Sequence, residues 1–570
     1  MLSIEEKYKK WMDADIPQEL RSSLQQMSSK EIEECFYKDL EFGTGGLRGI
    51  LGPGSNRLNI FVIRKVTTAF ALYLLKTYEN AKEMGVVISH DNRLYSREFT
   101  LEAAKVLSTY GIKTYIFDSL RPTPVLSFAT RYKKACGGIM ITASHNPKEY
   151  NGYKVYDEEG CQIVPDKIKP MLDIISSLPS EIDVGYGKEK EAGEIITLGK
   201  DVDDAYIEAV KTIQLNSSLN KNGFKIVYSP QHGTGLESAK RLFLELGYNV
   251  TYVEEQCSHD PEFKGTASPN PEMPEAYDKA LVYAVKENAD LILTTDPDAD
   301  RVGIAFKNKE GKYVLYTGNQ TGALLIHYIL SQRKEKGILP KDGILFDTIV
   351  TSSLGEEIAA SFGVKVESVL TGFKFIGEKI EEHLEKKDAT FLFGYEESYG
   401  YLISPFARDK DSMQALVMIS EMVNYYRLQN KCLDEVLDEI QKEYHYHEDK
   451  SYSIYFDGKS GIERMNEILS SLRENPFKEL EGNKVVAYDD IDSLTHYDLV
   501  NNTKTKINLP KSNVLKFFLK DGSTIAIRPS GTEPKCKFYY GAISKNSFEE
   551  ANKMPEKLHA SLMELLNIEE

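Results

Sequence analysis

The sequence predicts an α/β protein of four domains, in which three similar mixed-sheet α/β domains precede a smaller C-terminal α+β domain. The first observation is the length of 570 residues, which at roughly 150 residues per domain gives about four domains. The second is that short apolar runs alternate with amphipathic helical patterns, as in sheets built mainly from parallel strands. The third is a change of composition near residue 449. A hydrophobic share of 41% and a charged share of 28% are ordinary for a soluble globular protein.

Pairs of apolar runs recur along the first three predicted domains. The runs are 86–91 with 139–146, 225–230 with 291–296, and 344–347 with 390–394, and helical patterns at 99–109 and 237–246 lie between members. In each pair the second run ends in an unusual polar loop. Because ligands gather at the carboxyl ends of strands in such sheets, we expect each of the three domains to contribute one loop to a shared site.

The last part of the chain is richer in lysine and acidic residues. It has strand candidates at 453–456, 514–519 and 523–527, and the last of these leads directly into a basic loop. We therefore predict domains at 1–215, 216–325, 326–448 and 449–570.

Charge and cysteine usage limit the partners and the compartment. The formal net charge of −17 argues against a general nucleic-acid surface. The six cysteines are scattered without a C-x-x-C pair, which favours reduced thiols, and the first residues lack the apolar core of a signal peptide. The most apolar long stretch, 60–75, carries Arg64 and Lys65, which argues against a membrane span. We expect a cytoplasmic protein without nucleic-acid or membrane partners.

The first polar loop, 142–147, reads T-A-S-H-N-P and follows a buried β-branched run. Ser144 lies at its centre beside His145, which makes it a candidate nucleophilic hydroxyl. An ordinary polar turn is the alternative interpretation.

The second loop carries Asp296, Asp298 and Asp300, followed by Arg301. An EF-hand is excluded, because its sixth position requires Gly and its twelfth Glu, whereas this chain has Arg301 and Lys307 there. Three carboxylates on alternate residues suit Mg²⁺, and the guanidinium of Arg301 suits a phosphate. A surface acidic turn remains the alternative.

Two further loops are suited to a phosphorylated sugar. Glu396, Glu397 and Ser398 offer groups that bind sugar hydroxyls, unless they form a solvated hairpin. The loop from Arg528 to Lys535 offers cations, hydroxyls and a glycine, as in a phosphate cradle, although a plain Pro-Ser-Gly turn is equally consistent. The glycine-rich stretch 43–49 matches neither nucleotide-binding fingerprint.

These four motifs, T-A-S-H-N-P, D-P-D-A-D-R, G-Y-E-E-S and R-P-S-G-T-E-P-K, occur together and in this order. The sequence thereby resembles the α-D-phosphohexomutases, most closely the phosphoglucomutase branch with its phosphopentomutase relatives, from Gly43 to Lys535. The chain departs from the family pattern at Tyr395, which intervenes between Gly394 and Glu396, whereas many relatives read G-E-E-S without it. This leaves the placement of Tyr395 open, but not the role of the glutamate loop.

The resemblance implies a heart-shaped molecule with a central cleft and a phosphoserine at Ser144. It implies Mg²⁺ held by Ser144, Asp296, Asp298 and Asp300. Implied catalytic groups are Ser144, His145, Lys154, Arg48 and Lys410, with Lys154 as the candidate acid/base, although it could serve only as a charge. Implied substrate-binding residues are Arg301, Thr371, Gly372, Glu396, Ser398, Arg528, Ser530, Gly531, Thr532 and Lys535.

The implied reaction interconverts α-glucose 1-phosphate and glucose 6-phosphate, with glucose 1,6-bisphosphate as intermediate and primer. Phosphopentomutase and phosphomannomutase activities with the same mechanism are alternatives. A phosphatase, a bisphosphate-forming kinase-like enzyme and a catalytically silent sugar-phosphate sensor are more distant ones. A sugar phosphate is the expected partner of a monomer or weak homodimer.

Overall fold

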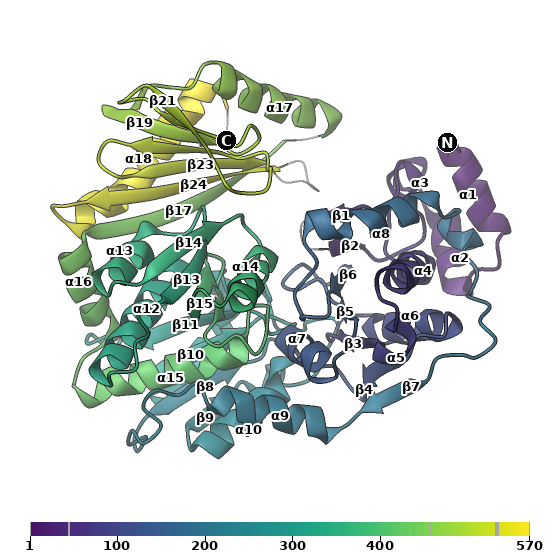
Figure 1. Ribbon diagram of the computed structural model, residues 1–570, viewed down its shortest axis with the longest axis horizontal. Coiled ribbons are helices and arrows are strands. Elements are labelled where there is room, and N and C mark those ends of the chain that lie inside the picture. The colour runs from purple at the N-terminus through teal and green to yellow at the C-terminus, as the bar shows by residue number, and fades with distance from the viewer. Residues whose placement is uncertain (1, 44–45, 457, 530–534, 569–570) are drawn as a thin grey trace. The chain divides into compact units, whose positions relative to one another are not determined.

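The computed structural model describes residues 2–43, 46–456, 458–529 and 535–568 (Figure 1). By compactness the chain divides into two units. The first unit comprises Met1–Gly318 and Gly372–Asn430, and the second comprises Asn319–Thr371 and Lys431–Glu570.

The first sheet of the first unit is mixed, with the strand order β1-β2-β6-β5-β3-β4-β7. From β5 to β7 neighbouring strands are parallel, and from β1 to β5 they are antiparallel. Its strands are β1 (Phe42–Gly43), β2 (Gly46–Ile50), β3 (Val86–His90), β4 (Thr114–Phe117), β5 (Gly137–Ile141), β6 (Tyr150–Tyr156) and β7 (Ile195–Leu198). The accompanying helices are α1 (Ile4–Asp13), α2 (Gln18–Gln26), α3 (Ser29–Phe36), α4 (Ile60–Thr77), α5 (Ala81–Met84), α6 (Ser96–Thr109), α7 (Thr123–Tyr132), α8 (Pro165–Ser177), η1 (Glu181–Asp183) and α9 (Lys200–Lys211).

Helices bury the centre of this sheet, where every residue of β3 and β5 is buried. Helix α4 starts at a side-chain cap, because Asn59 accepts hydrogen bonds from the backbone of Phe61 and Val62, both at 3.1 Å. Such a cap contributes about 1 kcal/mol. Phe70 of α4 joins Ile139 of β5 in one core cluster. The carboxyl end of β5 is therefore a rigid support for the loop that carries Ser144.

The second sheet of the first unit has the order β12-β11-β10-β8-β9. Strand β10 is buried throughout, between parallel β8 and antiparallel β11, so the loop that follows it starts from a fixed point. The elements are β8 (Lys225–Ser229), α10 (Gly235–Leu246), β9 (Asn249–Tyr252), η2 (Glu254–Gln256), η3 (Pro274–Tyr277), α11 (Asp278–Glu287), β10 (Leu291–Thr295), β11 (Val302–Lys307) and β12 (Tyr313–Tyr316).

The rest of the first unit is a hairpin flanked by two helices. Strand β15 (Thr390–Glu396) pairs with β16 (Gly400–Leu402), and the Glu396–Gly400 pair closes the turn that holds the third motif. Helix α14 (Phe373–Lys386) precedes the hairpin and α15 (Ser412–Leu428) follows it. Asp411 caps α15 by accepting hydrogen bonds from the backbone of Met413 and Gln414.

The second unit combines a parallel pair, β13 with β14, and an antiparallel sheet of the order β17-β24-β23-β22-β19-β20-β21, in which β18 also pairs with β19. The strands are β13 (Gly343–Thr348), β14 (Lys365–Val369), β17 (Tyr446–Tyr455), β18 (Glu479–Leu480), β19 (Asn483–Asp490), β20 (Thr495–Asp498), β21 (Thr503–Lys506), β22 (Leu515–Leu519), β23 (Thr524–Pro529) and β24 (Lys535–Ser544). The helices are α12 (Gly318–Glu335), α13 (Ser353–Ser361), α16 (Leu433–Tyr444), α17 (Gly458–Glu474) and α18 (Phe548–Leu566).

Most predicted elements are confirmed. The expected helices at 99–109 and 237–246 are α6 and α10, and the strand pairs β3/β5 and β8/β10 lie side by side in parallel. Strand β17 begins earlier than the predicted 453, because it pairs with β24 from Tyr446 onward. All six cysteines are free thiols. None of the described helices combines the length and the apolar composition that crossing a membrane requires. The heart-shaped arrangement and the domain boundaries stay predictions.

Candidate active site

Ser144 is buried in the loop that follows β5, with 3% of its surface exposed. Its Oγ donates a 2.7 Å hydrogen bond to Oδ2 of Asp296 and lies 3.2 Å from Nδ1 of His145. Its backbone has φ +51°, the left-handed region that side chains other than glycine seldom adopt. The structure thus brings the predicted nucleophile into contact with the predicted metal loop, 152 residues further along the chain.

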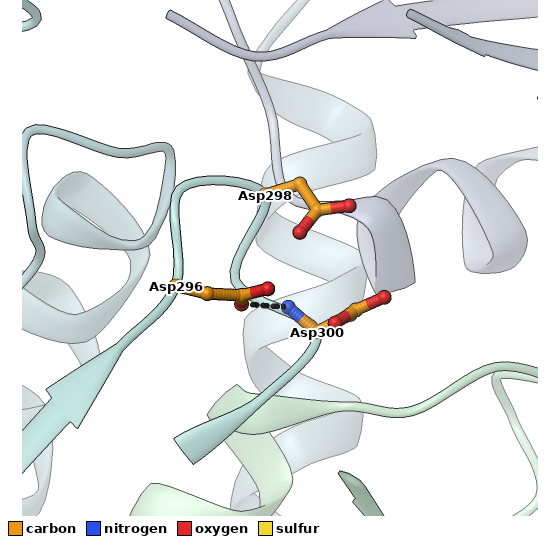
Figure 2. A group of neighbouring side chains, drawn as sticks. All are labelled: Asp296, Asp298 and Asp300. Carbon is orange, nitrogen blue, oxygen red and sulfur yellow. Dashed lines mark hydrogen bonds between the residues drawn. The ribbon is translucent and has the colours of Figure 1, made fainter. Parts of the chain in front are cut away.

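The aspartates of the second motif face one another at the carboxyl end of β10 (Figure 2). Each offers a carboxylate oxygen within 4.8 Å of the others, and all three side chains are buried. Oδ1 of Asp296 accepts hydrogen bonds from the backbone of Asp300 at 3.2 Å and Arg301 at 3.0 Å, which folds the loop back on itself. A surface acidic turn does not fit this burial, and that alternative is wrong.

Two of these buried oxygens lack hydrogen-bond partners. Oδ1 of Asp298 and Oδ1 of Asp300 have none among the described residues. A buried carboxylate oxygen without a partner is costly unless a ligand completes it. Three hard oxygen donors in such a cluster match the preference of Mg²⁺. The residues present therefore fit a divalent cation.

Two lysines lie against the triad. Nζ of Lys154, from β6, is 3.1 Å from Asp298 Oδ2 and 3.6 Å from Asp300 Oδ2. Nζ of Lys410 is 3.1 Å from Asp300 Oδ2 and 3.3 Å from Asp409 Oδ1. Burial opposes their charges, but the carboxylates outweigh it, so the pKa of Lys154 and the pKa of Lys410 are both raised. Both side chains are cations at neutral pH, which suits charge stabilisation or proton donation.

The triad members differ in acidity. Burial, reinforced by the charges of Asp298 and Asp300, raises the pKa of Asp296 well above its ordinary value. Burial also opposes ionisation of Asp298, but the ammonium of Lys154 outweighs it and holds the pKa of Asp298 below its ordinary value. The carboxylate that accepts the Ser144 hydrogen bond is thus the more basic of the two.

Three further predicted residues lie in or near the Ser144 loop: His145, Arg48 and Arg301. Nη1 of Arg48 donates a 2.7 Å hydrogen bond to Oδ1 of Asn146. Removal from water and the guanidinium groups of Arg301 and Arg48 lower the pKa of His145 well below 6.5, so its imidazole is neutral. Arg301 pairs with Glu272, so an incoming phosphate has to share this guanidinium with Glu272 or displace that carboxylate.

Residues far along the chain hold the aspartate loop, and none of the sequence motifs revealed them. Thr123, at the start of α7, donates from its backbone to the carbonyl of Asp298 at 2.9 Å and from Oγ1 to Asp298 Oδ2 at 3.0 Å. Ser412 donates from Oγ to the carbonyl of Ala299 at 2.5 Å. Neither residue belongs to a recognisable motif, and the distance along the chain gives no signal of either contact.

Gly233 lies beneath the aspartate loop. A Cβ on Gly233 would lie 2.4 Å from the carbonyl oxygen of Pro297, which is backbone and cannot rotate away. We expect Gly233→Ala to displace the loop and to weaken Mg²⁺ binding by about tenfold or more, as measured by calorimetric titration. Gly185→Ala is the matched control, because nothing lies within 4 Å of its Cβ. Equal Mg²⁺ affinity in the two variants would contradict the prediction.

The third motif contributes a buried carboxylate. Glu396 is 4% exposed, and its Oε1 accepts a 2.8 Å hydrogen bond from the backbone of Gly372, so these two predicted residues lie together. Ser398 is half-buried on the turn after β15. Thr371 belongs to the second unit, and its Oγ1 is buried without a hydrogen-bond partner in the described part of the chain.

The fourth motif joins β23 to β24 in the second unit. Arg528 lies near the end of β23, and Lys535 begins β24 with its Nζ 5.7 Å from the ring centre of Tyr455. The predicted residues Ser530, Gly531 and Thr532 lie outside the described residues. Their role as a phosphate cradle stays a prediction.

Four family domains match most of the chain. Residues 39–180, 204–311 and 317–444 match the phosphoglucomutase/phosphomannomutase alpha/beta/alpha domains I, II and III, and residues 473–557 match the C-terminal domain of the same family. The predicted four-domain organisation is confirmed by these matches.

Individual relatives agree with the family match. A phosphoglucomutase of Staphylococcus haemolyticus is 38% identical over 523 residues, covering 91% of this chain and 93% of the relative. One of Staphylococcus aureus is 37% identical over 549 residues, with coverages of 95% and 97%.

Solved structures share the fold. A phosphoglucomutase/phosphomannomutase family protein from Burkholderia thailandensis aligns with a TM-score of 0.66 at 19% identity, covering 92% of this chain and 97% of that one. Parafusin, a phosphoglucomutase from Paramecium in its open form, aligns with a TM-score of 0.68 at 19% identity, with coverages of 93% and 96%.

Proposed function

Because the chain belongs to the phosphoglucomutase/phosphomannomutase family, we propose that it interconverts α-glucose 1-phosphate and glucose 6-phosphate through a phosphoserine at Ser144. The protein is a phosphohexomutase, an isomerase. The identity of its sugar substrate and its mechanism are what we propose. The observation that carries it is the 2.7 Å hydrogen bond from Ser144 Oγ to Asp296 within a buried aspartate triad. A hydroxyl beside a cation-binding cluster is the arrangement that phosphoryl transfer requires.

The first half of the cycle moves the phosphoryl group from the enzyme to the sugar. The free hydroxyl oxygen of the sugar monophosphate bonds to phosphorus as the bond from phosphorus to Ser144 Oγ breaks. The sugar hydroxyl loses its proton, and Oγ gains one. Glucose 1,6-bisphosphate is the product of this half, and a catalytic amount of it would prime enzyme that has lost its phosphoryl group.

In the second half, the other phosphate of the bisphosphate returns to Ser144. The Ser144 hydroxyl must then release its proton, and two acceptors lie within hydrogen-bond distance, Asp296 Oδ2 at 2.7 Å and His145 Nδ1 at 3.2 Å. The raised pKa of Asp296 makes its carboxylate the stronger base of the two, whereas the lowered pKa of His145 makes the imidazole the weaker proton acceptor. The raised pKa of Lys154 keeps its amine protonated, so Lys154 could donate a proton to the leaving oxygen, or act only as a charge, but not act as a general base.

Asp296, Asp298, Asp300 and the oxygen on Ser144 would hold Mg²⁺. When bound, the ion neutralises phosphoryl charge during transfer. Lys410 and Arg48 add fixed positive charge around the same loops. Ser144 is 3% exposed, so little water reaches its oxygen, and this limits hydrolysis of the phosphoserine.

The remaining predicted residues would bind the sugar and its second phosphate. Glu396 and Ser398 are proposed to bind sugar hydroxyls, and Arg528, Ser530, Gly531, Thr532 and Lys535 the phosphate that is not reacting. Arg301, Thr371 and Gly372 complete the proposed substrate contacts. Buried polar groups of this kind reject a substrate that lacks the partner hydroxyl more strongly than apolar shape does.

Substrate preference tests this proposal directly. We expect kcat/KM for glucose 1-phosphate to exceed kcat/KM for mannose 1-phosphate and for ribose 1-phosphate, by roughly tenfold or more. The three monophosphates are compared side by side with Mg²⁺ and catalytic glucose 1,6-bisphosphate. A clear preference for the pentose would favour a phosphopentomutase, whereas release of inorganic phosphate without isomerisation would favour a phosphatase.

A further inference from the structure

We propose that Asp91, Arg93 and Thr142 form a positioning clamp that holds the Ser144 peptide in the conformation needed for phosphoryl transfer. None of them is assigned above to the substrate or to the metal. The inference rests on the proposed function, because it names residues that act on the phosphoryl carrier through its backbone.

Arg93 follows β3 and is 3% exposed. The guanidinium of Arg93 donates hydrogen bonds to four backbone carbonyls in the loop around Ser144. Nη2 donates to the carbonyls of Ser144 at 2.6 Å and Asn146 at 2.5 Å, and Nη1 donates to those of Pro147 at 2.8 Å and Tyr150 at 3.0 Å. Few side chains can satisfy so many carbonyls, since this requires the planar fork of arginine.

Asp91 and Thr142 hold the backbone N–H of Ser144, whereas Arg93 holds its carbonyl group. Thr142 Oγ1 accepts a 2.8 Å hydrogen bond from the backbone N–H of Ser144 and donates at 2.7 Å to Oδ2 of Asp91. The same carboxylate oxygen lies 3.2 Å from Nε of Arg93. The N–H and the C=O of Ser144 are therefore both anchored, directly or through one hydroxyl, to a single buried ion pair.

The backbone of Ser144 explains why such a clamp is needed. Its φ of +51° is disfavoured for a side chain with a Cβ, and such a conformation persists only where the surroundings determine it. In this conformation Thr142 accepts a hydrogen bond from the N–H of Ser144, and Arg93 donates one to its C=O. Released from them, the loop would relax, and Oγ would move away from its position beside Asp296.

The ion pair of Asp91 and Arg93 carries no net charge, so the clamp acts on position more than on the charge of the site. Replacing Arg93 by lysine keeps the charge but loses the fork. This separates positioning from electrostatics, because a purely electrostatic role would survive Arg93→Lys.

The test measures single-turnover transfer from phosphorylated enzyme to glucose 1-phosphate, together with steady-state kcat and KM. We expect Arg93→Lys and Thr142→Val to slow transfer by roughly 100-fold while KM stays nearly unchanged. Thr142→Ser keeps the hydroxyl and should restore most of the rate. Arg64→Lys is the matched control, since Arg64 forms a mostly buried ion pair with Glu102 in the same domain, and this variant should transfer at the wild-type rate.

The outcomes separate the two proposals. Wild-type protein that neither carries phosphate on Ser144 nor isomerises glucose 1-phosphate overturns the proposed function, and the clamp with it. If the wild type is active, wild-type transfer by Arg93→Lys or by Thr142→Val overturns the clamp alone, as does equal impairment of Thr142→Ser and Thr142→Val. The comparison of Thr142→Ser with Thr142→Val tests the clamp even if Arg93→Lys fails to fold.

Discussion

Ser144→Ala is expected to lower mutase turnover by about 10⁴-fold or more while sugar phosphates still bind, because the variant lacks the hydroxyl that is proposed to carry the phosphoryl group. Oγ of Ser144 is the hydroxyl that donates to Asp296 in this structure. The coupled formation of glucose 6-phosphate measures turnover, and calorimetry measures binding.

Two further variants sharpen the Ser144 test. Ser144→Thr should also fail, because a β-branched residue at φ +51° is strained and its methyl group displaces the oxygen. Ser176→Ala, on the exposed side of α8, is the matched control. Intact-mass measurement should find one phosphate on wild-type protein and none on Ser144→Ala. Near-wild-type turnover by Ser144→Ala would overturn the entire scheme.

The second large effect concerns the metal. Chelation of divalent ions should abolish transfer, and added Mg²⁺ should restore it. Asp298→Asn should remain impaired by roughly 10²-fold or more even at saturating Mg²⁺, because it replaces a buried carboxylate with a neutral amide against the ammonium of Lys154.

Asp173→Asn, on α8 and away from the aspartate loop, controls for the general loss of one negative charge. Metal affinity is measured separately by calorimetry, so that weak binding and slow transfer are distinguished. Full activity in excess chelator would show that the aspartates form a polar cluster without a catalytic ion.

Local sequence predicts the motifs well, because each loop directly follows a buried strand. The polar loops after β5 and β10 begin where the apolar runs end, and the alternation of carboxylates marks Asp296, Asp298 and Asp300 as candidate metal ligands, with a surface acidic turn as the alternative. Helices α6 and α10 are likewise predictable from the local sequence, because their apolar residues repeat with a period of 3.6 residues.

The supporting contacts were not predictable, because they depend on the tertiary fold. Arg93 reaches the Ser144 carbonyl 51 residues away, and Thr123 reaches Asp298 across 175 residues. Arg93 and Thr123 each look like an ordinary polar residue beside a strand or at the start of a helix. The left-handed backbone conformation of Ser144 could not be predicted from the sequence either, since serine has no preference for the left-handed region.

The hydrogen bonds of Thr123 and Ser412 to the aspartate loop also bear on how the protein matures during synthesis. The loop at 296–300 lies at the middle of the chain, but Ser412, which bonds to Ala299, and Lys410, which pairs with Asp300, are synthesised more than a hundred residues later. Contacts of such long range form late, because loop closure opposes them. Domains emerging from the ribosome generally fold as units, starting at the N-terminus. A nascent chain that ends before residue 410 thus carries all three aspartates but lacks the contacts of Lys410 and Ser412 with their loop, so the described arrangement of the loop is complete only after most of the chain has been translated.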